Sequence, residues 1–196
     1  LTGLYTTEYS MRARETGGIS DPDFLHELES FSVWMRQQTG VRHVRTFSDI
    51  MKRLNKNLHD DDPAMYRLPE QRELAAQYLL LYEMSLPYGL NLNNQISVDK
   101  SAVRVTVTLD VLSTNEILAL NESADAWLKT NAPHIDALPA SGAIVMFANI
   151  AARNIRAMLI GTTIALILIS LILVIALRSV KIGLISLLPN LVPAAM

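Results

Sequence analysis

Apolar and polar positions alternate in short periods along most of the chain, but the last part is apolar almost throughout. The longest apolar segment, 157–177, has 21 residues without a charge or a proline. A bilayer core takes about 20 apolar residues of helix at about 1.5 Å each. Arg153 and Arg156 precede the segment, and Arg178 and Lys181 follow it, as expected for helix ends anchored at the headgroups. We predict a transmembrane helix over 157–177, because a buried core helix that is apolar on every face is seldom this long.

A second apolar segment follows closely. Residues 178–181 form a short basic loop, and residues 182–196 are again mostly apolar. Fifteen residues are too few to cross a bilayer, yet no polar stop ends them. We therefore predict the start of a second transmembrane helix, truncated at residue 196, in a longer multi-pass protein.

The residues to which we assign a part in transport lie in this second segment: Gly183, Pro189, Asn190 and Pro193. Proline removes an intrahelical hydrogen bond, and an asparagine amide must find a partner inside the bilayer. Our hypothesis is that the helix bends at the prolines against the first span, with Gly183 permitting close approach. The alternative is a kink that only packs against neighbouring helices.

Residues 1–156 show both helical and strand periods. The clearest strand is 103–111, where Val103, Val105, Val107, Leu109 and Val111 alternate with polar residues. The other predicted elements are a strand at 1–7, a helix from about residue 20 to Gly40, a strand at 41–47, helices at 48–58 and 69–85, a helix from Ser113 to before Pro133, and a weak strand at 134–140.

Three sequence patterns predict helix starts. Ser20 with Asp23 resembles a capping box, and Ser113 with Glu116 forms a second one. Ser48 or the residue after it, Asp49, can cap the predicted helix at 48–58.

The order of elements predicts the fold class, α+β. It is β, α, β, then a mostly helical insertion at about 48–100, then β, α, β. Two split βαβ units of this kind make a ferredoxin-like sandwich with helices on one face of a small sheet. We expect this domain to occupy 1–142, with a helical connector over 143–156 leading into the span.

Charge is confined to the first part of the chain. All 19 acidic residues lie at or before Asp136, and residues 1–156 carry a net charge of about −4. A mildly acidic domain argues against nucleic acid as a partner. The chain has no cysteine, so no disulfide stabilises the domain.

Motifs for enzyme chemistry are absent from the sequence. There is no glycine-rich phosphate loop, no paired Cys or His at metal spacing and no nucleophile elbow. The run from His59 to Asp62 lacks the alternating oxygens and glycine turn of a calcium loop, and we interpret it as a solvated loop. His26, His43 and His134 lie far apart in sequence. We predict no catalytic residue, no cofactor and no metal.

Two aromatic and apolar stretches leave two interpretations open. Phe24, Phe31 and Trp34 share one helix face, and the segment 78–84 reads YLLLYEM. Both stretches suit an ordinary core. Because the second is apolar on more than one side, it also suits a hydrophobic groove or subunit contact.

Several segments resemble a known family. These are GAIVMFANI before the first span, LRSVKIGLISLLPNLVPAA after it, and DIMKRLNKNLHDDDPAMYRLPE and ELAAQYLLLYEMS in the domain. They are similar to the RND superfamily exporters of the MMPL and Patched-like branch, in which a span is followed by Arg-Ser, a short basic turn and an Asn-Pro-containing helix.

The resemblance implies a proton-driven exporter of the bacterial inner membrane, built as two similar halves with a periplasmic porter-like domain in each. Residues 1–156 would be periplasmic. The implied partners are the lipid bilayer, a hydrophobic or lipid-like substrate, the remaining transmembrane helices and the second porter domain, with homo-oligomerisation left open. The family's proton-carrying acids lie in a later helix, and 157–196 contains no Asp or Glu. Orientation rests on the family, because two basic residues flank each end of the span.

The alternative function is a membrane receptor with a periplasmic ligand-sensing domain. A receptor would follow its span with a long polar linker. Here four residues lead into another apolar segment, which favours transport.

Overall fold

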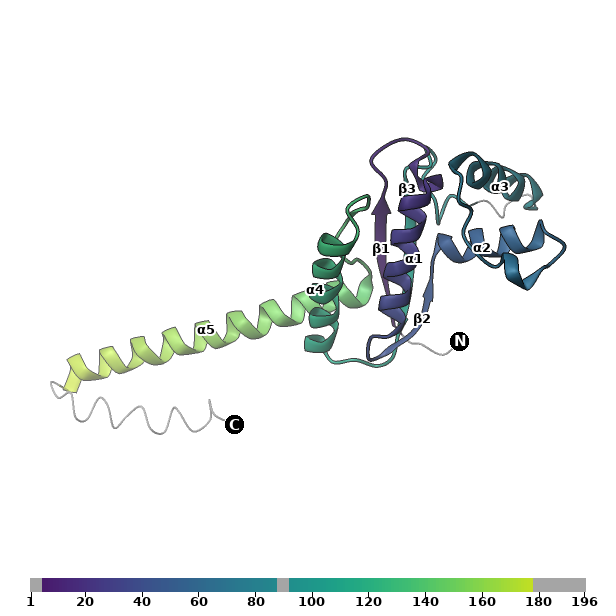
Figure 1. Ribbon diagram of the computed structural model, residues 1–196. Helices are drawn as coiled ribbons and strands as arrows, with labels where there is room; N and C mark the ends of the chain where they lie inside the picture. The colour runs from purple at the N-terminus through teal and green to yellow at the C-terminus, as the bar shows by residue number, and fades with distance from the viewer. Residues whose placement is uncertain (1–4, 88–91, 178–196) are drawn as a thin grey trace. The chain divides into compact units, whose positions relative to one another are not determined.

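The computed structural model describes residues 5–87 and 92–177 of the chain. Figure 1 shows its elements, which occupy the following residues. They are β1 (Tyr5–Arg12), η1 (Gly18–Ser20), α1 (Pro22–Arg36), β2 (Val41–Arg45), α2 (Phe47–Asn57), η2 (Pro63–Met65), α3 (Arg72–Ser85), β3 (Ala102–Leu109), α4 (Thr114–Asn131), β4 (Asp136–Ala137) and α5 (Ala143–Leu177).

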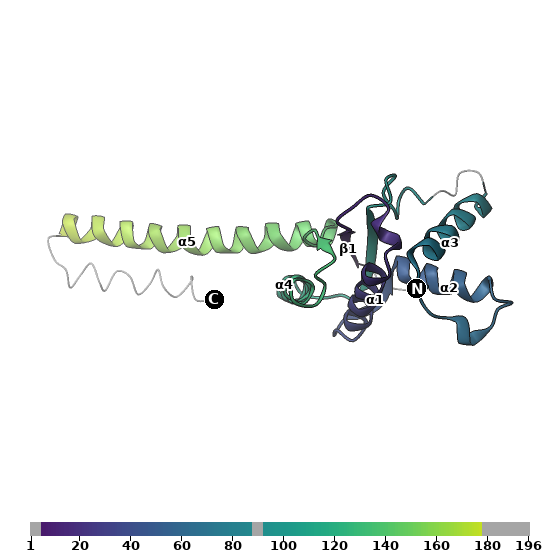
Figure 2. The same cartoon turned by 45° about the horizontal axis from the view of Figure 1, so that its top comes forward.

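The strands form one antiparallel sheet in the order β2-β3-β1-β4. Since β3 runs antiparallel to both β1 and β2, these two strands are parallel to each other, and α1 connects them. In the same way α4 connects β3 to β4. This arrangement is two interleaved βαβ units, and it confirms the predicted ferredoxin-like fold. Figures 1 and 2 show α1 and α4 on the same face of the sheet.

The core lies between the sheet and these two helices. Alternate residues of the two central strands are fully buried, and Tyr9 of β1 lies opposite Val105 of β3. Phe24, Leu28 and Phe31 of α1 are buried on the same side. The period of two in the sequence therefore separates a buried face of the sheet from a polar one.

The segment between β2 and β3 contains α2, η2 and α3. Met51 of α2 and Leu79 of α3 are buried. Tyr78 of α3 donates a hydrogen bond of 3.1 Å to the side-chain oxygen of Asn55 in α2. The two helices of the insertion thus share both apolar and polar contacts.

All four described strands differ from their predicted bounds. β2 ends at Arg45, short of the predicted residue 47, because Thr46 caps α2 and Phe47 begins it. β1 continues to Arg12, beyond the predicted 1–7.

β3 ends at Leu109, short of the predicted residue 111, and Val111 is 69% exposed where a continued alternation would bury it. The side chain of Asp110 pairs with Arg42 of β2 at 2.6 Å.

The predicted strand at 134–140 is reduced to the two residues of β4. On one side of β4 the N–H of His134 donates to the Glu27 carboxylate at 2.9 Å instead of to a strand. On the other side Pro139 has no N–H to donate.

The helix caps show which sequence signals were correct. Ser113 and Glu116 form the predicted capping box of α4. The prediction was wrong for α1, which is capped by Asp21, because Ser20 is buried in the short 3₁₀ turn before it. It was also wrong for α2, whose cap is Thr46.

The chain divides into two compact units, 1–148 and 149–196. The helix α5 runs without a break from Ala143 to Leu177 and so begins in the first unit. The predicted domain limits at residues 142 and 156 stay predictions.

Candidate functional site

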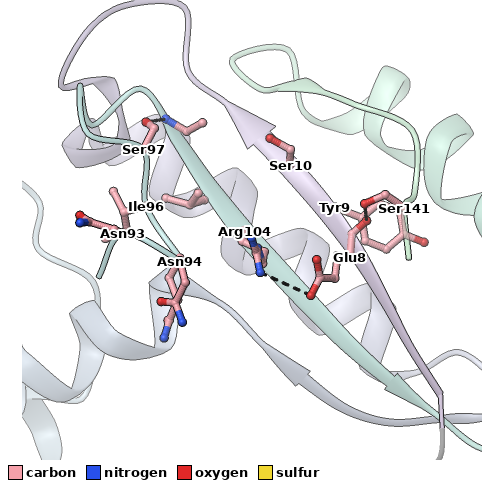
Figure 3. A pocket seen from close by; sticks show the side chains of 12 residues that line it. Glu8, Tyr9, Ser10, Asn93, Asn94, Ile96, Ser97, Arg104 and Ser141 are labelled. Atoms are coloured by element: carbon pink, nitrogen blue, oxygen red, sulfur yellow. Dashed lines mark hydrogen bonds and ion pairs between the residues drawn. The ribbon is translucent and has the colours of Figure 1, made fainter. Parts of the chain in front are cut away.

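The face of the sheet opposite α1 and α4 carries polar side chains. Glu8 and Ser10 of β1 alternate with buried residues, and the register places Ser10 opposite Arg104 of β3. Arg104 reaches diagonally toward Glu8, and the Nη1–Oε1 distance is 3.6 Å (Figure 3). This distance is too long for a hydrogen bond, so the two side chains form a loose ion pair.

The segment that returns from the insertion builds a wall beside this pair. Ile96 forms a β-bridge with Val103, and the N–H of Arg104 donates to the Gln95 carbonyl at 2.8 Å. The pairing of β2 with β3 ends where Arg45 meets Thr106, so the returning segment occupies the edge of β3 over residues 102–105, which β2 leaves open.

The sheet and this wall border an open cavity of about 270 Å³. On the side of β1 it is closed by Ser141, whose backbone bonds with Glu8 in both directions, at 2.8 and 2.9 Å. We call the cavity the polar groove and define it by the side chains of Glu8, Ser10, Asn94, Gln95, Ser97 and Arg104.

The polar groove contains a carboxylate, a guanidinium, hydroxyls and amides. This set can bind a polar ligand through hydrogen bonds and opposite charges. The sequence alone does not reveal this set of groups, because Glu8 and Arg104 are 96 positions apart and meet only through the register of β1 with β3. The alternation of polar residues at positions 6, 8, 10 and 12 was the available signal.

The predicted aromatic face of α1 belongs to the core. Phe31 packs edge-on against Tyr9 at 5.5 Å between ring centroids, and Trp34 stacks on Trp127 of α4 at 5.6 Å. Burial raises the pKa of the Tyr9 hydroxyl, which donates a hydrogen bond of 2.9 Å to Asn121. These contacts join α1, α4 and β1, and they favour the core interpretation for this face.

Part of the segment 78–84 lies in the core, and part of it forms an exposed apolar surface. Tyr78 and Leu79 are buried. Leu80, Leu81 and Met84 are exposed, Met84 by 76%, and their spacing of three and four residues places them on one face of α3. This exposed face is an apolar surface of the insertion.

The acidic run at the end of α2 is an exposed turn. Asp60 and Asp61 have positive φ angles of 53° and 60°. The carboxylate of Asp62 accepts a hydrogen bond of 2.9 Å from the N–H of Ala64. Among the described residues, no three His, Cys, Asp or Glu side chains gather to hold a metal ion.

Within the described residues, one helix is long and apolar enough to cross a membrane, at Ala143–Ala176. None of the residues in its most apolar window is buried, unlike those of a soluble core helix. The proposed transport residues Gly183, Pro189, Asn190 and Pro193, and the second apolar segment that contains them, lie outside the described residues.

One protein-family model matches residues of both units of the chain. The model of the MMPL family matches residues 6–192. The chain belongs to the MMPL family. A search of curated proteins found no match. As an MMPL-family chain it is part of an RND-type membrane transporter, and α5 supplies an apolar helix suited to the bilayer.

Proposed function

We propose that this MMPL-family chain is part of a proton-driven exporter that moves hydrophobic or lipid-like substrates out of the bacterial cytoplasmic membrane. The observation that carries the proposal is the family match, which spans the ferredoxin-like domain and the apolar helix together. Residues 1–156 lie in the periplasm in this proposal, and α5 continues from that domain into the bilayer.

The proposal assigns proton coupling to parts of the transporter outside this chain. Residues 157–196 contain no Asp or Glu. A proton relay within a membrane requires ionisable side chains, so other helices must provide it. The role left to this chain is to form the path of the substrate, and we propose no enzymatic step for it.

The apolar face of α3 supports a path for hydrophobic molecules. Leu80, Leu81 and Met84 expose apolar side chains on the insertion. Exposed apolar patches of this kind occur at surfaces that meet another protein surface or an apolar ligand. In the proposal, this face contacts either the substrate or another part of the transporter.

The test is export by the full-length protein in proteoliposomes with an imposed proton gradient. A fluorescent lipid analogue should move when the gradient is present and stop when a protonophore removes it. Movement that persists without the gradient would contradict proton coupling.

The same assay tests the proposed transport residues. Pro189→Ala and Asn190→Leu should each lower export sharply at unchanged protein level, since they remove the bend and the buried amide. Leu191→Ile in the same segment is the matched control and should export normally. Normal export by Pro189→Ala and Asn190→Leu would leave the prolines with a packing role only.

A further inference from the structure

The polar groove contains a carboxylate, a guanidinium and a hydroxyl that make few contacts with the described residues. The side chains of Glu8 and Arg104 are 35% and 47% exposed, so each is accessible from the groove. Apart from the loose pair between them, neither side chain interacts with another described residue. Within the same part of the chain, the hydroxyl of Ser10 also makes no hydrogen bond.

These groups are held in fixed positions. Glu8, Ser10 and Arg104 stand on the two central strands, whose pairing runs through eight residues of each strand. The wall beside them is fixed by backbone hydrogen bonds of Gln95 and Ser97 to β3, at 2.8 and 2.9 Å. Ser97 itself is used in this structure, because its Oγ accepts bonds from Ser101 and Ala102. A ligand would therefore meet a site that needs little rearrangement.

The charges select the chemistry of the ligand. A guanidinium binds phosphate or carboxylate oxygens through two parallel N–H groups, and a carboxylate binds an ammonium through its N–H groups. A molecule with both groups would replace one weak contact of 3.6 Å with two charge-assisted hydrogen bonds.

The size of the groove limits the ligand. Pockets for drug-sized molecules have volumes of about 300–1,000 Å³. The polar groove, at about 270 Å³, lies just below this range, and its lining includes Ile96 and Val103 beside the polar side chains. Its volume suits a small charged group better than a long acyl chain.

We propose that the polar groove binds a small zwitterion, with the phosphate or carboxylate of the ligand at Arg104 and its primary ammonium at Glu8. The ligand is either a free molecule or the headgroup of a lipid, and both present the same chemistry. The site is independent of the exporter proposal, because it follows from the ferredoxin-like domain alone.

The test is calorimetric titration of the full-length protein in a detergent free of zwitterionic lipid. The probes are O-phosphoethanolamine, phosphocholine and glycerol 3-phosphate. O-phosphoethanolamine should bind at least about tenfold more tightly than the other two. Phosphocholine has no N–H to offer Glu8, and glycerol 3-phosphate has no cation. Equal binding of the three probes, or no binding of any, would overturn the proposal.

Variants separate the two halves of the site. Arg104→Gln should weaken O-phosphoethanolamine by about tenfold or more, and Glu8→Gln should remove its preference over phosphocholine. Arg12→Gln, on the same face of β1 but outside the groove, should bind as the parent does. Thermal unfolding followed by tryptophan fluorescence confirms that each variant is folded. Folded Glu8→Gln and Arg104→Gln variants with parental binding would overturn the proposal.

A last comparison identifies the source of the ligand. Dihexanoyl phosphatidylethanolamine, used below its micelle concentration, presents the same headgroup with short chains. Tighter binding than O-phosphoethanolamine assigns the groove to a lipid headgroup, and equal binding assigns it to a free zwitterion. Failure of the lipid to compete with O-phosphoethanolamine would overturn a shared site.

Discussion

Lys52 of α2 places its ammonium nitrogen 2.6 Å from the carboxylate of Glu29 in α1, and the two side chains are only 12% and 22% exposed. Ser48 also donates to Glu29, at 2.7 Å. Burial alone would lower the pKa of Lys52, but the hydrogen bonds and charges of Glu29 and Asp49 raise it. This pair joins the helical insertion to the ferredoxin-like core.

Breaking the pair should destabilise the domain. We expect Lys52→Met to lower the free energy of unfolding by about 1–3 kcal/mol, because it leaves the partly buried Glu29 with only the more distant Arg36, at 4.0 Å, as a cation. Urea unfolding followed by tryptophan fluorescence measures the effect, since both tryptophans of the chain, Trp34 and Trp127, lie in this domain.

Two further variants test the origin of that loss. The double variant Lys52→Met with Glu29→Gln should lose less than the sum of the two single variants. Lys129→Met, on the exposed side of α4, should unfold like the parent. Additive losses would show that the ion pair contributes nothing.

The central strand gives a second prediction. Val105 is fully buried opposite Tyr9, so Val105→Asp should cost several kcal/mol by burying an unpaired charge. Thr108→Asp, on the polar face of the same strand, is the matched control and should cost much less. If the two variants had the same melting temperature, the assignment of the buried face would be wrong.

The features that could be predicted from the sequence are those that depend on residues close together in the chain. The alternation around Val105 and the capping box of Ser113 and Glu116 both rest on residues a few positions apart, and the structure confirms them. The cap of α1 could not be predicted in the same way, because Ser20 carries the right pattern but is drawn into a buried 3₁₀ turn.

What could not be predicted depends on contacts between distant segments. The polar groove requires Glu8 and Arg104 to meet across two strands, and Lys52 and Glu29 meet only because α2 packs on α1. The short length of β4 has the same origin, since the backbone of His134 is bound by Glu27. No periodicity in the sequence encodes these pairings.

The contact between His134 and Glu27 predicts a pH dependence of stability. Nδ1 of His134 lies 2.6 Å from the Glu27 carboxylate. The hydrogen bond and negative charge of Glu27 raise the pKa of His134, Asp23 raises it further, and Arg14 opposes the shift. A raised histidine pKa stabilises the fold fully below the unfolded value, about 6.5, and this stability is lost as pH rises through the folded value.

The difference in melting temperature between parent and His134→Gln should therefore be largest at pH 5.5 and shrink toward pH 8.5. Glu27→Gln should remove the same pH dependence. His26→Gln is the control on α1, because its imidazole forms no ion pair with any described residue. A difference that is constant with pH would contradict the role of this charge.

A fourth prediction concerns the boundary of the ferredoxin-like domain. Val145 and Ala148, at the start of α5, are buried, so a fragment of residues 1–148 should keep its core intact and stay soluble without detergent. A fragment that reaches Leu177 should need detergent, because it exposes the apolar helix. Size-exclusion chromatography in plain buffer distinguishes the two. A monodisperse longer fragment in that buffer would argue against a membrane helix.

The most direct test of the account is the accessibility of single cysteines in the full-length transporter, since this chain has none of its own. Ser30→Cys lies on the exposed side of α1, Leu168→Cys lies near the middle of the predicted span 157–177, and Ser179→Cys belongs to the predicted basic loop 178–181. In intact spheroplasts a membrane-impermeant maleimide should label Ser30→Cys alone, and lysis should add Ser179→Cys. Labelling of Leu168→Cys in intact spheroplasts, or of Ser179→Cys before lysis, would contradict a helix that crosses the membrane with residues 1–156 in the periplasm.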